Sequence, residues 1–189
     1  NYFKFKGIDF MISKSGFSKQ GGYEIYVENS ISGLKLYDYI IKVGNKFNLK
    51  PGCPNVIERI EGALLSYGND MDNNDNPFEC GLDRYINLES NIEFLGKKAL
   101  QKVKLEGIKR KLMGVKINEK NINLTSELKL VGENKETIGY LRSAVYSPRF
   151  KMIVGIAMIN IEYCKDSQNF KTNINNKEVS GSVCNLPMN

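Results

Sequence analysis

The pattern of polar and apolar residues predicts two β-strands near the start of the chain. They cover residues 9–13 and 23–27, of which the second alternates, and the polar, glycine-rich stretch 16–22 lies between them. Gly21 and Gly22 can adopt the positive φ that the end of such a loop requires. The two strands are therefore expected to pair as a hairpin.

The second of these strands has two chemically different faces. Because successive side chains point to opposite sides of a strand, Glu24 and Tyr26 share one face. The other face carries Tyr23, Ile25 and Val27, which are typical of a core. A carboxylate beside aromatic rings can hold a flat heterocycle, because the carboxylate accepts two parallel N–H bonds and the rings pack on its faces. The alternative is an edge strand with a solvated polar face.

Helical periodicity follows the strands and predicts an α+β layer. Amphipathic helices are expected over residues 32–43 and 56–67, and a shorter helix over residues 96–104. The apolar stripe of the first helix consists of Leu34, Tyr37 and Ile41. Its candidate terminal residues are Ser30 or Ser32 at the start and Gly44 at the end.

The second half of the chain has a different pattern. From Leu112 onward, short β-prone runs such as "KLMGVKI" and "MIVGIAMI" alternate with turn residues, which is typical of an all-β sandwich or small barrel. We therefore expect two domains, residues 1–106 and 107–189, with the boundary near Gly107.

Alternate acidic and amide residues in the turn 67–81 resemble the first ligands of an EF-hand calcium loop. The match fails at Asp75, where that loop needs glycine, and at Gly81, where it needs a bidentate glutamate. Asx turns are the better interpretation, so no metal site is expected.

Composition narrows the chemistry. The chain has no histidine, which removes imidazole as a base, nucleophile partner or metal ligand. Its four cysteines form no C-x-x-C pair, so reduced thiols in a cytoplasmic protein are expected. The net charge of +6 is scattered rather than gathered in a stripe, and no apolar run reaches the roughly 18 residues of a membrane span. Neither nucleic acid nor a membrane is an expected partner.

Several ordered motifs resemble the aminomethyltransferase family, which includes the T-protein of the glycine cleavage system. "SGFSKQGGYEIYVE" resembles the family's "TGxxGFEIY", and "ERIEGALLSYGNDMDNNDNPFECGLD" resembles "LRLEAGMxLYGxDMDxxxxPxEAGL". "FLGKKAL" is similar to "FIGREAL", and "IGYLRSAVYSPRF" to "xGxVTSGxxSPxL". The resemblance implies a partial ferredoxin-like, folate-binding α+β domain followed by an antiparallel β-barrel or jelly-roll domain.

Within the family, the glycine-rich loop and the Asn/Asp-rich turn look most like the branch that demethylates sulfonium compounds. This likeness implies transfer of a methyl group from dimethylsulfoniopropionate to tetrahydrofolate, giving methylmercaptopropionate and 5-methyltetrahydrofolate. It implies that Glu24 and Tyr26 bind tetrahydrofolate and that Phe17 contacts the substrate. The demethylase branch carries tryptophan in place of Phe17, and an aromatic ring there can hold a cation. No catalytic residue is assigned, because folate nitrogen can attack the sulfonium methyl directly.

Two other functions stay open. An aminomethyltransferase would use an amine donor, but Pro54-Asn55-Val56 replaces the family's "ARD" with its folate-contacting arginine. A non-catalytic folate-binding module is the second alternative. The resemblance also implies that the chain is the C-terminal half of such an enzyme and has little activity alone. The expected partners are thus a small sulfonium substrate and the N-terminal half of the same protein, with a homodimer as an open alternative.

Overall fold

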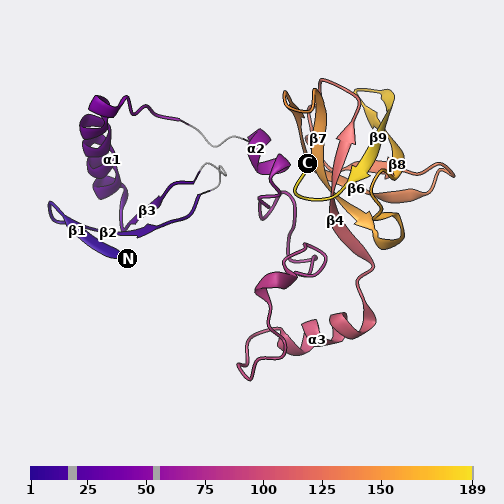
Figure 1. Ribbon diagram of the computed structural model, residues 1–189, viewed down its shortest axis with the longest axis horizontal. Coiled ribbons are helices and arrows are strands. Elements are labelled where there is room, and N and C mark those ends of the chain that lie inside the picture. Colours follow the sequence, from indigo (N-terminus) through magenta and orange to yellow (C-terminus); the bar gives the residue numbers. More distant parts are fainter. Residues whose placement is uncertain (17–20, 53–55, 189) are drawn as a thin grey trace. The chain divides into compact units, whose positions relative to one another are not determined.

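The computed structural model in Figure 1 describes residues 1–16, 21–52 and 56–188. Contacts divide the chain into two compact units, Asn1–Glu58 and Arg59–Asn189. The sequence-based boundary near Gly107 lies between helix α3 (Lys97–Glu106) and strand β4 (Arg110–Ile117). It separates the helical region from the β-strands of the second half, and as a domain boundary it stays a prediction.

The first unit contains an antiparallel sheet in the order β1-β2-β3. Its strands are β1 (Tyr2–Phe5), β2 (Ile8–Ser13) and β3 (Glu24–Val27). The expected pairing of the last two is confirmed, and both glycines of the Gly-Gly pair have positive φ. Strand β1 was not expected, because its sequence YFKF has only one polar residue and shows little alternation.

Helix α1 (Ser30–Gly44) follows the sheet and leads into the 3₁₀ turn η1 (Asn45–Phe47). The helix is confirmed, but both candidate serine caps were wrong. The cap is Asn29, whose backbone is extended and whose Oδ1 accepts a hydrogen bond from the Ser32 N–H at 2.9 Å. Gly44 has a helical φ of −72° and does not end the helix by a left-handed turn; the side chain of Leu49 lies closely against it.

The predicted apolar stripe of α1 is not the face that packs. Leu36 is the buried residue of the helix, whereas Leu34 and Tyr37 are exposed. Val27 of β3 lies against Gly33, and the rings of Phe5 and Tyr39 meet with centroids 4.8 Å apart. The face of α1 that packs on the sheet is therefore displaced by about one residue from the predicted face.

Helix α2 (Val56–Glu61) is much shorter than the predicted 56–67. Ala63 adopts a left-handed φ of 57°, and the N–H of Ser66 bonds to the Asp70 carboxylate at 2.7 Å instead of continuing the helix. The turn that the Asp70 carboxylate holds has therefore overridden the helical periodicity of residues 62–67. Helix α3 is confirmed, and Gly96 and Gly107 flank it with positive φ.

The second unit ends in a closed barrel with strand order β4-β7-β6-β5-β8-β9. The remaining strands are β5 (Leu128–Val131), β6 (Thr137–Ser147), β7 (Met152–Asn160), β8 (Asn169–Ile174) and β9 (Lys177–Cys184). Short 3₁₀ turns lie at η2 (Asp83–Tyr85) and η3 (Ile161–Tyr163). The predicted fold class, α+β with a C-terminal antiparallel barrel, is confirmed.

Strand β7 explains why the sequence "MIVGIAMI" is continuously apolar. Ile153, Ala157 and Ile159 belong to the core inside the barrel. Val154 and Ile156 belong to a second core, which contains Ile60 of α2. Both faces of β7 are therefore buried, and alternation disappears, as expected for a strand without a solvated side.

Substitutions at neighbouring residues of β6 should lower the free energy of unfolding by different amounts, because one side chain points into the barrel and the next points out. Leu141 is fully buried in the barrel core, whereas Tyr140 points outward and is partly exposed. We expect Leu141→Ala to lower the free energy of unfolding by roughly 2–5 kcal/mol, because it removes packing and leaves a cavity. The control Tyr140→Ala should cost less than about 1 kcal/mol in the same urea titration. Equal losses would contradict the placement of Leu141 inside the barrel.

Candidate functional site

The two predicted binding residues lie on the edge strand β3. Glu24 pairs with Ser13 and Tyr26 with Met11 of the central strand. The hydroxyl of Ser15 donates a hydrogen bond to the Glu24 carboxylate. The loop before β3 therefore helps to orient this carboxylate. Both side chains are exposed, so the carboxylate and the ring are open to a ligand.

The register extends this face across the whole sheet. Tyr2 of β1 pairs with Met11, and Met11 pairs with Tyr26, so the three side chains form one row. Phe3 and Phe10 pair on the opposite face, where their rings stack with centroids 5.8 Å apart. The sheet therefore has one face of aromatic rings, a thioether and carboxylates, and one apolar face toward α1.

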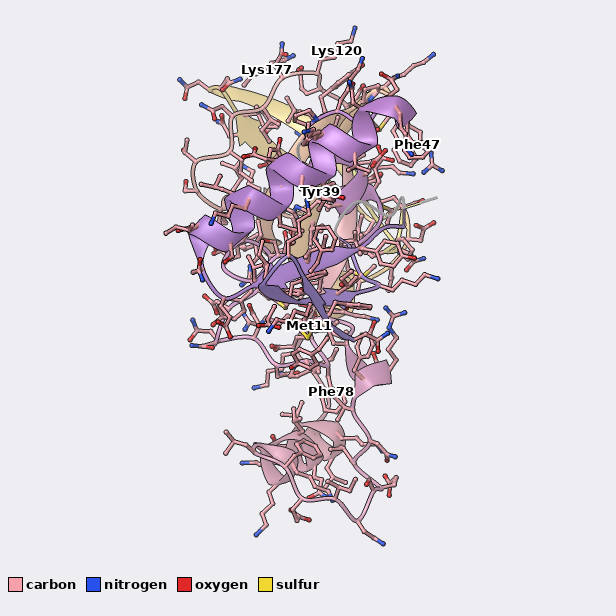
Figure 2. The ribbon with its side chains drawn as sticks, turned by 90° about the vertical axis from the view of Figure 1, so that its left-hand side faces the viewer. Met11, Tyr39, Phe47, Phe78, Lys120 and Lys177 are labelled. Carbon is pink, nitrogen blue, oxygen red and sulfur yellow. The ribbon has the colours of Figure 1, made fainter. Side chains whose placement is uncertain are left out.

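Figure 2 shows the same division: Tyr39 lies between α1 and the sheet, and Met11 lies on the far side of the sheet. The predicted alternation of β3 is thus confirmed. The expected core side is weaker than predicted, because only Val27 is partly buried against the helix. Ile25 and the residue before β3, Tyr23, remain exposed.

A hollow of about 260 Å³ is lined by the row of Tyr2, Met11 and Tyr26 and also by Phe10 and Val27. The carboxylates of Asp9 and Glu28 stand at its border. These residues fit one part of a folate-like ligand: exposed rings offer stacking surfaces, and Glu24, two residues from Tyr26, can accept two N–H bonds from a ring edge. Phe17, the predicted substrate contact, lies outside the described residues.

The Asn/Asp-rich turn 67–81 does not bring together a set of acidic metal ligands. Among the described residues no group of three or more His, Cys, Asp or Glu side chains could hold a metal ion. The turn is instead built from Asx bonds, as expected: the Asn74 N–H bonds to Asp72 at 2.7 Å, and the Phe78 N–H to Asn76 at 3.0 Å.

Sequence reasoning missed the arginines that hold this turn. Arg59 of α2 donates to the buried Asp70 carboxylate at 2.7 Å and to the Ser143 hydroxyl of β6 at 3.1 Å. Arg142 of β6 donates to Asp75 at 2.6 Å and to the backbone oxygen of Asp70 at 3.0 Å. No periodicity links residues so far apart in the chain, so only the folded structure reveals these pairs.

Asp75 is the centre of the second group. Its side chain has no exposed surface, and it also lies 2.9 Å from Arg110 of β4. Burial alone would raise the pKa of the Asp75 carboxyl, but hydrogen bonds from Arg142 and the Asp72 N–H, together with two guanidinium charges, hold that pKa below its usual value.

The cysteines offer no nucleophile in the described part of the chain. Burial raises the pKa of the Cys80 thiol to about 11, so it stays protonated at neutral pH. Cys184 is buried and Cys164 half-buried, and burial raises the pKa of both thiols. All three are free thiols, and the fourth cysteine, Cys53, lies outside the described residues.

The Asp75 group should make stability depend on pH. Because its folded-state pKa is lowered, Asp75 stabilises the fold above the unfolded pKa near 4, and this contribution is lost as the pH falls through the folded pKa. We expect Asp75→Asn to lower the free energy of unfolding at pH 7 by roughly 1–3 kcal/mol. The difference from the unsubstituted chain should shrink below about pH 4 in denaturant titrations. Asp166→Asn, at an exposed position, is the control and should show no such dependence on pH. An effect of Asp75→Asn that is independent of pH would contradict the account.

Comparison with known proteins gives consistent matches over both units. The model for the GCVT N-terminal domain matches residues 1–90, and the model for the glycine cleavage T-protein C-terminal barrel domain matches residues 110–188. A solved structure, the glycine cleavage system aminomethyltransferase T from Bartonella henselae, superimposes with a TM-score of 0.79 at 20% identity. It covers 94% of this chain and 49% of that one, and it supports the fold.

Two curated relatives are closer in sequence. Dimethylsulfoniopropionate demethylase from Ruegeria pomeroyi is 38% identical over 82% of this chain and 42% of its own length. Aminomethyltransferase from Bacillus cytotoxicus is 30% identical over 98% of this chain and 52% of its own length. The chain spans about half the length of these relatives. The two family models together cover most of the chain, which therefore belongs to the glycine cleavage T-protein family of aminomethyltransferases.

Proposed function

We propose that this chain is part of a cytoplasmic, tetrahydrofolate-dependent methyltransferase that demethylates dimethylsulfoniopropionate. The observation that carries the proposal is the open sheet face with Glu24 and Tyr26, oriented in part by Ser15. The 38% identity with the Ruegeria pomeroyi demethylase supports the choice of donor. No helix of the described residues is long and apolar enough to cross a membrane.

Glu24 and Tyr26 have separate roles in this proposal. Glu24 would accept two N–H bonds from the edge of the pterin, and the ring of Tyr26 would pack against it. Tetrahydrofolate would supply the nitrogen that takes the methyl group. The chain fixes the direction of approach, and such alignment can contribute roughly 7–11 kcal/mol to lowering a barrier.

The chemistry requires no nucleophile from the protein. The methyl group would leave a positively charged sulfur, so the carbon–sulfur bond breaks to give a neutral thioether and no proton has to reach the leaving group. The positive charge would leave as the proton that the accepting nitrogen gives up to water. A chain without histidine, whose described thiols are buried or half-buried with raised pKa values, is compatible with this step. Phe17 remains our proposed contact for the sulfonium cation.

An aminomethyltransferase is the second candidate. The observation that favours it is the 30% identity with the Bacillus cytotoxicus enzyme over 98% of this chain, a longer match than that with the demethylase. The same sheet face would bind tetrahydrofolate, and an amine would replace the sulfonium donor. A non-catalytic folate-binding module is the remaining alternative.

Folate binding should depend on Glu24. We expect Glu24→Gln to raise the dissociation constant for tetrahydrofolate about tenfold or more, because an amide can accept only one of the two N–H bonds. Asp38→Asn, which removes an exposed charge from α1, is the matched control and should leave affinity unchanged. Isothermal titration calorimetry measures both. Equal affinities of Glu24→Gln and the unsubstituted chain would overturn the site assignment.

The choice of donor needs its own experiment. The chain is assayed for methyl transfer to tetrahydrofolate with dimethylsulfoniopropionate or dimethylglycine, alone and with a polypeptide that corresponds to the N-terminal half of the curated demethylase. We expect little turnover by the chain alone, and turnover of the sulfonium when both halves are present. Preference for dimethylglycine would favour the amine enzyme. Robust turnover by the chain alone would contradict the need for the other half, and folate binding without any turnover would favour the binding module.

A further inference from the structure

A segment that follows the sheet of the first unit by more than fifty residues carries most of the chain's excess positive charge. Residues 83–111, called here the α3 surface, contain eight basic and four acidic residues. Their net charge of +4 compares with +6 for the whole chain. The other 160 residues carry the remaining +2, so this segment holds the larger share of the excess positive charge, although Arg110 pairs with Asp75 and Glu79 outside it.

The α3 surface also exposes large apolar side chains. Tyr85, Ile92, Leu95 and Leu105 are 71% to 103% exposed. Among the described residues, α3 packs closely against no other helix or strand. Exposed apolar residues scattered singly are ordinary, but four within about twenty positions, next to concentrated charge, indicate a surface that another molecule covers.

The loop that presents Ile92 and Leu95 is held in place by its own hydrogen bonds. Lys97 is buried, and its ammonium group donates to the Ser90 and Ile92 backbone oxygens at 2.6 and 3.2 Å. It also lies 3.3 Å from the Glu93 carboxylate. A buried lysine that is fully engaged fixes the loop while its apolar side chains stay outside, so their exposure is a property of the ordered structure.

A hollow of about 320 Å³ lies at the C-terminal end of α3. Its apolar floor is formed by Phe78, labelled in Figure 2, together with Val103 and Ile108. Lys104, Lys111 and Asp83 also line it, and both lysines are exposed. Lys104 lies 3.1 Å from the exposed Glu89 carboxylate, a surface ion pair that an acidic ligand would have to replace. The hollow is large enough for one apolar side chain, and its two ammonium groups can pair with carboxylates on either side of that residue.

We propose that the α3 surface binds an acidic polypeptide segment that inserts an apolar side chain between Lys104 and Lys111. The charge selects the partner: a second copy of this chain would bring the same positive surface and be repelled. The shape argues against a bilayer, because a flat lipid surface cannot fill a concave hollow. The proposal does not depend on the folate site.

The test is binding of a fluorescein-labelled dodecapeptide of glutamates and leucines to the full chain, measured by fluorescence anisotropy. The double variant Lys104→Glu with Lys111→Glu should weaken binding about tenfold or more, because attraction at the hollow becomes repulsion. The control is Lys129→Glu with Lys151→Glu, which changes the net charge equally at two exposed lysines of the barrel. We expect the control to change affinity less than about twofold, and added salt to weaken binding to the unsubstituted chain.

A second variant tests the apolar part without touching charge. Leu105→Ser alters a side chain that is 88% exposed, so it should leave the fold intact and weaken peptide binding. Equal losses in the two double variants, or no binding of the peptide by the unsubstituted chain, would overturn the proposal. Tighter binding to phosphatidylserine vesicles than to the peptide would reassign the surface to a membrane. Self-association that Leu105→Ser abolishes would reassign it to a second copy.

Discussion

A carboxylate buried between two arginines fixes the second unit. Asp75 lies on a turn with no helix or strand of its own, yet it contacts Arg142 of β6 and Arg110 of β4. Removing a buried charge from water is costly unless its partners are well placed, so the turn can adopt this conformation only against the finished barrel. Asp70 repeats the arrangement with Arg59, which also reaches Ser143 of β6. The barrel thereby determines the shape of the chain that precedes it.

This dependence explains which features the sequence could predict. The barrel strands follow from short-range pattern, because β-prone runs separated by turn residues predict them. The early end of α2 depends on Asp70, several residues further on, and the three arginines are paired with residues up to 84 positions away. Such pairs leave no periodic trace. The prediction of the α1 cap was wrong for a local reason. Asn29 and two nearby serines can all cap a helix, and the structure shows the extended backbone of a cap at Asn29.

The candidate site was predictable in one respect only. A period of two placed Glu24 and Tyr26 on the same face, and the structure agrees. The extension of that face to Tyr2 and Met11 required the register of three strands, and β1 had not been recognised. Binding residues often depend in this way on neighbours across a sheet, because each strand contributes only alternate side chains.

The central claim is that the ligand lies on the Tyr2–Met11–Tyr26 face of the sheet. The most direct measurement is an NMR titration with tetrahydrofolate that follows the Met11 methyl group and the Tyr26 ring. The Ile12 methyl groups are the reference for the opposite face, where Ile12 pairs with Ile25. The account predicts that the Met11 and Tyr26 signals shift together and saturate at one dissociation constant, while those of Ile12 stay in place. Shifts at Ile12 without shifts at Met11 and Tyr26, or saturation with no change at either face, would contradict it.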